Sequence, residues 1–94
     1  MSEYIPEYVR IKSIEPTRNP DGSENRGLLI VTIETDDGEE YRFAIDFWQL
    51  CIEGRMADIL RHWKYNVIPH TRRLRDMSDE EYWEFIEQFI GMEV

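Results

Sequence analysis

The chain has 94 residues, of which 41% are apolar and 13% aromatic, and its formal net charge is −9. This length predicts one domain with one modest core, residues 1–94, and the apolar content excludes an intrinsically disordered chain. The longest apolar run, 28–31, is too short to cross a membrane, and the first residues lack the pattern of a secretory signal. Cys51 is the only cysteine, so no internal disulfide can form, and a cytoplasmic location is the simplest expectation.

The first part of the chain is expected to hold one strand between two irregular segments. Residues 1–7 are interpreted as a loose N-terminal lead-in. Apolar and charged residues alternate over 8–14, which is typical of a half-buried strand, and Pro16 is expected to end it. The segment 16–27 is rich in turn-forming and polar residues and therefore predicts a long exposed loop.

The segment 28–46 gives the clearest pattern, a hairpin of two strands. A two-residue turn would place the apolar faces of the strands on opposite sides of the sheet. A three-residue turn, Asp36-Asp37-Gly38, places them on the same side, and Gly38 then occupies the position that requires a left-handed backbone. The predicted pairs are Ile33 with Tyr41, Val31 with Phe43 and Leu29 with Ile45.

A helix is predicted over about 47–64. Asp46 has the character of an N-cap, with Gln49 three residues later as in a capping box. The apolar residues of this segment recur at helical spacing on one stripe: Trp48, Ile52, Met56, Ile59, Leu60 and Trp63. Gly54 lies inside the pattern, and the sequence leaves open whether it breaks the helix.

The next segment, 65–77, has no clean period and contains Pro69, which disfavours helix at the residue before it. It is therefore interpreted as a connector. A second main helix is predicted over about 79–90, because Ser78 and Glu81 form a capping-box pattern and Gly91 is placed to end it. Its expected buried stripe contains Tyr82, Phe85, Ile86, Phe89 and Ile90, with Trp83 at the edge.

Strands that precede helices in this way predict a small α+β domain. We expect a three-stranded antiparallel sheet, built from the hairpin 28–46 and the strand near 8–14. Two main helices, about 47–64 and 79–90, are expected to pack on one face of the sheet.

The last helix carries an unusual row of acidic residues. Glu80, Glu84 and Glu87 lie on the side opposite its expected apolar stripe, and residues 76–94 contain seven acidic residues and no Lys or Arg. Like charges at this spacing destabilise a helix, so a compensating positive charge is expected from elsewhere. The row is the first candidate site, a surface that binds a protein partner with a basic surface.

The positive charge is concentrated in a second segment. Residues 55–75 carry six Lys or Arg against Asp58 alone. This basic block has the cations and aromatic residues of an anion-binding or nucleic-acid-binding surface, the alternative candidate site. Its members are Arg61, Lys64, Tyr65, Arg72, Arg73 and Arg75. The same arginines could instead fold back on the acidic helix as internal counter-charges.

No catalytic or metal-binding pattern is recognisable. Cys51 and His62 would share a helix face but lie about 16 Å apart, too far for one ion. We therefore expect no catalytic residues, no metal and no cofactor. The sequence favours a small acidic protein-binding module, an inhibitor or adaptor that docks on a basic surface of a partner, including one that binds nucleic acid. The alternative is a nucleic-acid or nucleotide binder that uses 61–75. Neither reading involves a membrane, and both leave a homodimer open.

Overall fold

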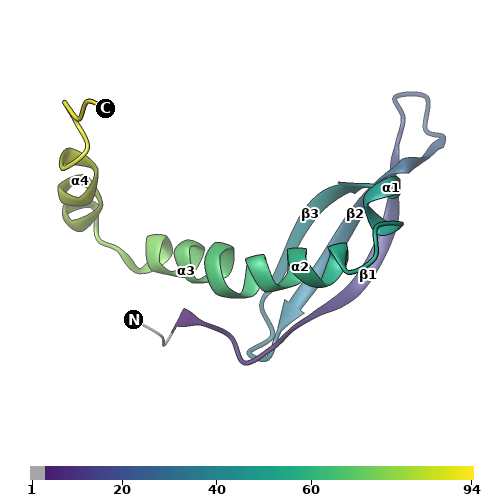
Figure 1. The fold of residues 1–94 in the computed structure, drawn as a ribbon, viewed down its shortest axis with the longest axis horizontal. Helices are drawn as coiled ribbons and strands as arrows, with labels where there is room; N and C mark the ends of the chain where they lie inside the picture. The colour runs from purple at the N-terminus through teal and green to yellow at the C-terminus, as the bar shows by residue number, and fades with distance from the viewer. Residues whose placement is uncertain (1–3) are drawn as a thin grey trace.

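The structure is a computed structural model, and it describes residues 4–94. Its centre is a three-stranded antiparallel sheet in the order β1-β2-β3 (Figure 1). The strands are β1 (Val9–Arg18), β2 (Glu24–Thr35) and β3 (Glu40–Asp46). Helices follow the strands in the chain, which confirms the predicted α+β class.

The β2–β3 hairpin has the register that the apolar pattern predicts. Ile33 pairs with Tyr41, Val31 with Phe43 and Leu29 with Ile45. The amide of Thr35 donates to the carbonyl of Glu39 at 3.0 Å, and Gly38 closes the turn at φ +85°, a conformation that glycine adopts without a side-chain clash. The three-residue turn is therefore confirmed.

The first hairpin is longer than predicted. β1 does not end at Pro16 but continues to Arg18, and β2 begins at Glu24, so residues 16–18 and 24–27 of the expected loop belong to strands and only the tip is a turn. Proline is tolerated because β1 is an edge strand and the register shifts directly after Pro16. The polar composition of this segment therefore indicates an exposed hairpin end.

Gly54 breaks the first predicted helix. A single turn, α1 (Phe47–Leu50), is followed by α2 (Arg55–His62), and Gly54 lies between them at φ +77°. Asp46 has an extended backbone but makes no side-chain cap, so the predicted capping box is absent. Because of the break, Trp48 and Ile52 are exposed, whereas the rest of the predicted stripe packs on the sheet.

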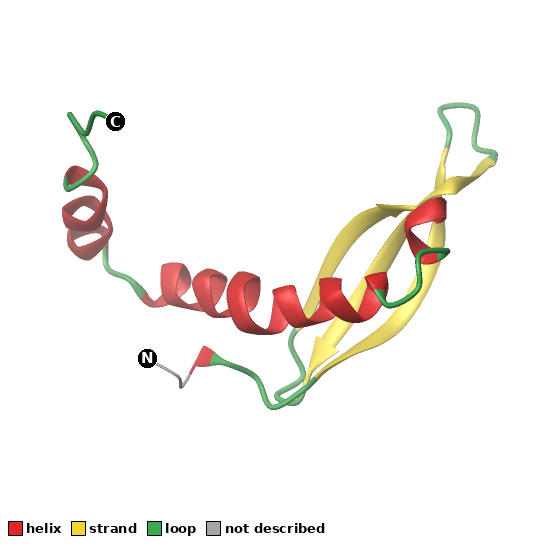
Figure 2. Ribbon diagram, in the orientation of Figure 1, coloured by secondary structure: helices red, strands yellow, loops and turns green. Residues whose placement is uncertain are grey.

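The predicted connector 65–77 is wrong, because the helix continues through Pro69. A π-helical turn, η2 (Trp63–Val67), joins α2 to α3 (Ile68–Asp76) and forms one long helix (Figure 2). Pro69 cannot donate to the carbonyl four residues earlier, and its ring would crowd that carbonyl in a regular α-helix. The wider π turn directly before the proline accommodates both effects.

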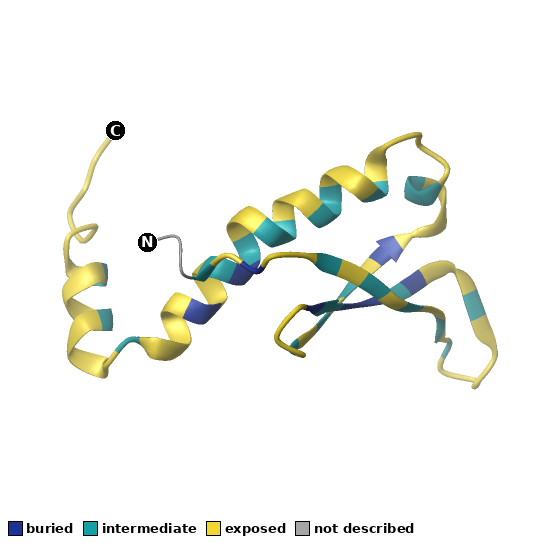
Figure 3. Ribbon diagram, turned by 90° about the horizontal axis from the view of Figure 1, so that it is seen from below, coloured by how far each residue is buried: buried dark blue, intermediate teal, exposed yellow. Residues whose placement is uncertain are grey.

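The core lies between the sheet and this long helix. Its buried members are Leu29, Val31, Ile33, Ile45 and Ile68. Trp63 stacks on Phe43 with ring centroids 5.1 Å apart, which confirms it as a core residue. The buried segments in Figure 3 are concentrated in this region.

The last helix, α4 (Asp79–Glu87), is shorter than the predicted 79–90 and stands away from the sheet (Figure 1). Ser78 caps it as predicted, since its hydroxyl accepts from the amide of Glu81 at 3.2 Å. Its apolar stripe is not buried as expected, for none of its residues is buried and Phe85 is exposed. The expected packing of both main helices on one sheet face therefore holds for α2 but not for α4.

The N-terminal lead-in lies along the long helix. Its residues 1–3 fall outside the described part of the chain. Pro6 is buried, the carbonyl of Glu7 accepts from Lys64 Nζ at 2.8 Å, and the carbonyl of Tyr4 accepts from Arg72 at 3.3 Å. The segment 4–7 is thereby fixed to the basic side of the helix.

Candidate functional site

The residues of the basic block are available for binding only where they are exposed and not already paired within the chain. Arg72 is almost enclosed, with 9% of its side chain exposed. Its guanidinium lies 2.9 Å from Asp37 Oδ1 and 2.8 Å from Glu39 Oε1. Arg75 donates to Glu39 Oε2 at 2.5 Å. These two arginines therefore tie α3 to the turn between β2 and β3.

The charges in this cluster stabilise one another. The hydroxyl of Thr35 hydrogen-bonds to Asp37 and, together with the charge of Arg72, lowers the pKa of the Asp37 carboxyl. The hydrogen bond from Arg75 lowers the pKa of Glu39. Burial by itself would lower the pKa of Arg72, but its neighbours outweigh burial and the pKa is raised. Asp37, Glu39 and Arg72 therefore stay charged at neutral pH.

The remaining members of the block are more accessible. Arg61 pairs with Asp58 of its own helix, and Lys64 lies 5.2 Å from the ring of exposed Tyr65. Arg73 lies 5.8 Å from the ring of Phe85 and forms no ion pair within residues 4–94. The structure thus separates the six predicted residues. Arg72 and Arg75 are engaged with the hairpin turn, Lys64 donates to the carbonyl of Glu7, and Arg61, Tyr65 and Arg73 are exposed.

The acidic row is open and uncompensated. Glu80, Glu84 and Glu87 are exposed, and none of them enters an ion pair in the described part of the chain. The interpretation that Arg72, Arg73 and Arg75 are its counter-charges is wrong. Arg72 and Arg75 pair with Asp37 and Glu39, and Arg73 forms no ion pair within residues 4–94. The charges of α4 therefore face water.

Trp83 lies in this acidic row. It follows Glu80 by three residues and precedes Glu84 and Glu87, so the four side chains share one side of α4. Trp83 is 59% exposed, and its indole stacks on the ring of Tyr82, with centroids 5.1 Å apart and planes 5° apart. A large, rigid aromatic ring rimmed by three carboxylates is a surface that can anchor a complex. We call Glu80, Trp83, Glu84 and Glu87 the acidic-tryptophan face.

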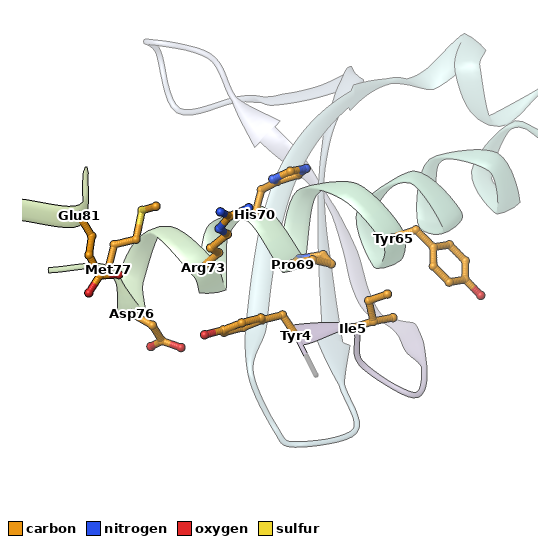
Figure 4. A pocket seen from close by; sticks show the side chains of 9 residues that line it. All are labelled: Tyr4, Ile5, Tyr65, Pro69, His70, Arg73, Asp76, Met77 and Glu81. Atoms are coloured by element: carbon orange, nitrogen blue, oxygen red, sulfur yellow. The ribbon is translucent and has the colours of Figure 1, made fainter. Parts of the chain in front are cut away.

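A hollow of about 540 Å³ lies beside α3 (Figure 4). Its lining consists of Tyr4 and Ile5 from the N-terminal segment, Tyr65, Pro69, His70, Arg73 and Asp76 from the long helix, and Met77 and Glu81 beyond it. We call this hollow the α3 groove; it holds the cation of Arg73 and the carboxylates of Asp76 and Glu81, so its lining is mixed in charge. The sequence singled out Tyr65 and Arg73 but could not place them in a groove, since it indicated no helix at Pro69.

Other functional features are few. No group of three or more His, Cys, Asp or Glu side chains that could hold a metal ion occurs within residues 4–94. Cys51 is exposed and unpaired. No helix among these residues is both long and apolar enough to cross a membrane.

Comparison with known proteins places no constraint on these sites. No family model, curated protein or solved structure shows significant similarity to the chain. The functional argument therefore depends on the chain's own residues.

Proposed function

We propose that this chain is a small, non-catalytic protein-binding module, and that the acidic-tryptophan face of α4 docks on a basic surface of a partner protein. The observation that carries the proposal is that Glu80, Glu84 and Glu87 form no ion pair with any of residues 4–94, on a helix that stands away from the sheet. Carboxylates without a counter-charge repel one another, and a basic partner would relieve that repulsion.

The apolar side chains of α4 support a docking role. Trp83 and Phe85 in α4, and Phe89 and Ile90 in the turns that directly follow it, are all exposed. A helix that binds in a groove of another protein uses apolar anchors with helical spacing and charged residues around them. The arrangement accords with an inhibitor or adaptor that occupies a cationic site, including one that otherwise holds nucleic acid, in the cytoplasm.

The proposal is tested by comparing what three forms of the immobilised protein capture from a nuclease-treated extract. The forms are the wild type, a triple variant Glu80→Gln/Glu84→Gln/Glu87→Gln, and a control variant Glu15→Gln/Glu24→Gln/Glu53→Gln with the same change in net charge. The wild type and the control should retain a shared set of basic proteins, which moderate salt releases. The triple variant should lose that set, and a triple variant that keeps every wild-type partner would contradict the proposal.

A further inference from the structure

The sheet has a second face, opposite the long helix, and a hollow of about 360 Å³ lies on it. Val31 of β2 belongs to the core under the helix, so its neighbour Thr32 points to this second face, because side chains alternate along a strand. Thr32 pairs with Ser13 of β1 and with Arg42 of β3. The three side chains therefore form one row across the sheet, and all three line the hollow.

Thr32 has a buried hydroxyl group without a partner in the chain. The residue is only 7% exposed, yet its side chain forms no hydrogen bond within residues 4–94. Most buried polar side chains in proteins are hydrogen-bonded, and leaving one unpaired costs free energy. A hydroxyl that lines a hollow in this state is available to a ligand.

The backbone of β1 is irregular at the same place. The register of β1 against β2 shifts between Ile11 and Ser13, and both Lys12 and Ser13 line the hollow. A bulge of this kind redirects side chains and is often found next to binding sites. Here it lets Lys12 reach across β2, so that its Nζ lies 2.5 Å from Oε2 of Glu40 on β3.

The charges around the hollow leave one unpaired group of each sign. Glu40 hydrogen-bonds to Lys12, and this bond, together with the charges of Lys12 and Arg42, lowers the pKa of its carboxyl. Two cations thus share one carboxylate, and Arg42 itself forms no ion pair within residues 4–94. Glu15 of β1 also lines the hollow, is exposed, and forms no ion pair in the same part of the chain. A guanidinium and a carboxylate on opposite edge strands therefore border one hollow without neutralising each other.

We propose that this hollow binds a small zwitterion whose carboxylate and ammonium groups are close together, the class of the free α-amino acids. The carboxylate of the ligand accepts from the guanidinium of Arg42 and from the hydroxyls of Thr32 and Ser13, and its ammonium donates to Glu15. Glu15 repels a simple anion and Arg42 repels a simple cation, whereas a zwitterion pairs with both. The volume is near the lower end of the range for small-molecule sites, which suits a ligand of few atoms.

The experiment is an NMR titration of the isotope-labelled full chain with L-alanine and with its two fragments, propionate and ethylammonium. L-Alanine should shift the amide signals of Ser13, Thr32 and Arg42 until they saturate, with a Kd of about 1 mM, as expected for an open site and a ligand of few atoms. Each fragment should bind at least about tenfold more weakly, because it lacks one of the two charged contacts.

Three variants test the contacts one at a time. Thr32→Val keeps the shape of the side chain but removes the hydroxyl, and it should weaken L-alanine binding about tenfold. Arg42→Gln should weaken the binding of both L-alanine and propionate by about the same factor. Glu15→Gln should weaken L-alanine binding but not propionate binding, because the variant no longer repels the anion. Arg61→Gln, on α2, is the control and should bind L-alanine as the wild type does. Thermal unfolding of each variant shows whether its fold is intact.

Three results would each overturn the inference. The first is the absence of a saturable shift at these amides up to about 50 mM L-alanine, far above the expected Kd. The second is a fragment that binds as tightly as L-alanine, which would show a site for a simple ion. The third is a loss of binding in Arg61→Gln equal to that in Arg42→Gln, which would show an effect of net charge alone.

The site is separate from the acidic-tryptophan face, because α4 stands away from the sheet (Figure 1). Glu80→Gln/Glu84→Gln/Glu87→Gln should therefore bind L-alanine as the wild type does. Failure of either proposal leaves the other unaffected.

Discussion

The long helix and α4 are both amphipathic segments, yet they have opposite surroundings. The helix formed by α2, η2 and α3 buries Ile68 completely and is tied to the sheet by Arg72. The C-terminal arm, residues 77–94, has no buried residue, although its apolar residues are large. The comparison shows that an apolar stripe alone does not determine whether a helix packs within its own chain or against another. The two helices differ in the charges beside their stripes. Arg72 and Arg75 of the long helix pair with carboxylates of the hairpin turn, whereas the three glutamates of the acidic row form no ion pair within residues 4–94.

The largest expected difference between the two regions is in core packing. Ile68→Ala removes a side chain with 0% exposure and should lower the free energy of unfolding by about 3 kcal/mol. Ile90→Ala removes the same atoms from a residue that is 73% exposed in the arm and should cost at most about 0.5 kcal/mol. Urea denaturation of both variants measures the difference. Equal losses would show that the arm is packed.

The second prediction concerns the arginines. Arg72→Met should lower the free energy of unfolding by about 2 kcal/mol, because Asp37 and Glu39 lose their counter-charge and the carbonyl of Tyr4 loses a donor. Arg73→Met is the matched control and should change the global stability little, because Arg73 is exposed and forms no ion pair within residues 4–94. An Arg73 effect as large as that of Arg72 would contradict the assignment of the two roles.

Acid should lower the stability that the ion pairs between α3 and the hairpin turn provide, over a defined range of pH. The pKa values of Asp37 and Glu39 are lowered in the fold from their ordinary values of 3.8 and 4.5. Their contribution to stability is therefore complete above the unfolded-state pKa values and is lost as the pH falls through the lower folded-state values. Thermal unfolding between pH 7 and pH 2, followed by circular dichroism, should show this loss, and Asp37→Asn/Glu39→Gln should flatten it. An unchanged acid profile in the double variant would assign the loss to other carboxylates.

The smallest expected effect is local to α4. Ser78→Ala removes the cap that accepts from the amide of Glu81 and should cost the helix about 1 kcal/mol. Amide exchange in α4 should accelerate about fivefold, while the exchange of β2 and the midpoint of global unfolding stay unchanged. Ser23→Ala, in the turn of the first hairpin, is the control and should leave α4 unaffected.

The sequence predicts those features that depend on neighbouring residues. The register of Ile33 with Tyr41 follows from alternation and from Gly38, and the cap at Ser78 follows from a four-residue pattern. The helix through Pro69 was missed because the general preference of the residue before proline is overridden by the π turn. Gly54 and Pro69 both disfavour helix, and the sequence alone does not show that the helix breaks at Gly54 and continues through Pro69.

The candidate site also combines features that the sequence predicts with features that only the fold brings together. The row of Glu80, Glu84 and Glu87 is visible in the sequence because it has helical spacing. The partners of Arg72 are not visible, because Asp37 and Glu39 are more than thirty residues away and meet it only when α3 crosses the hairpin turn. Trp83 was assigned to the edge of a buried stripe, since an amphipathic pattern is the same whether the helix faces its own core or another chain.

Hydrogen exchange of the full chain tests the central claim that α4 is an open docking element in the monomer. At about 1 µM, amides in α4 should exchange at least about 1,000-fold faster than those in β2, relative to their intrinsic rates, because the arm can open without the core. Protection of α4 equal to that of Ile33 in the dilute sample would show a helix packed in its own fold and would contradict the account.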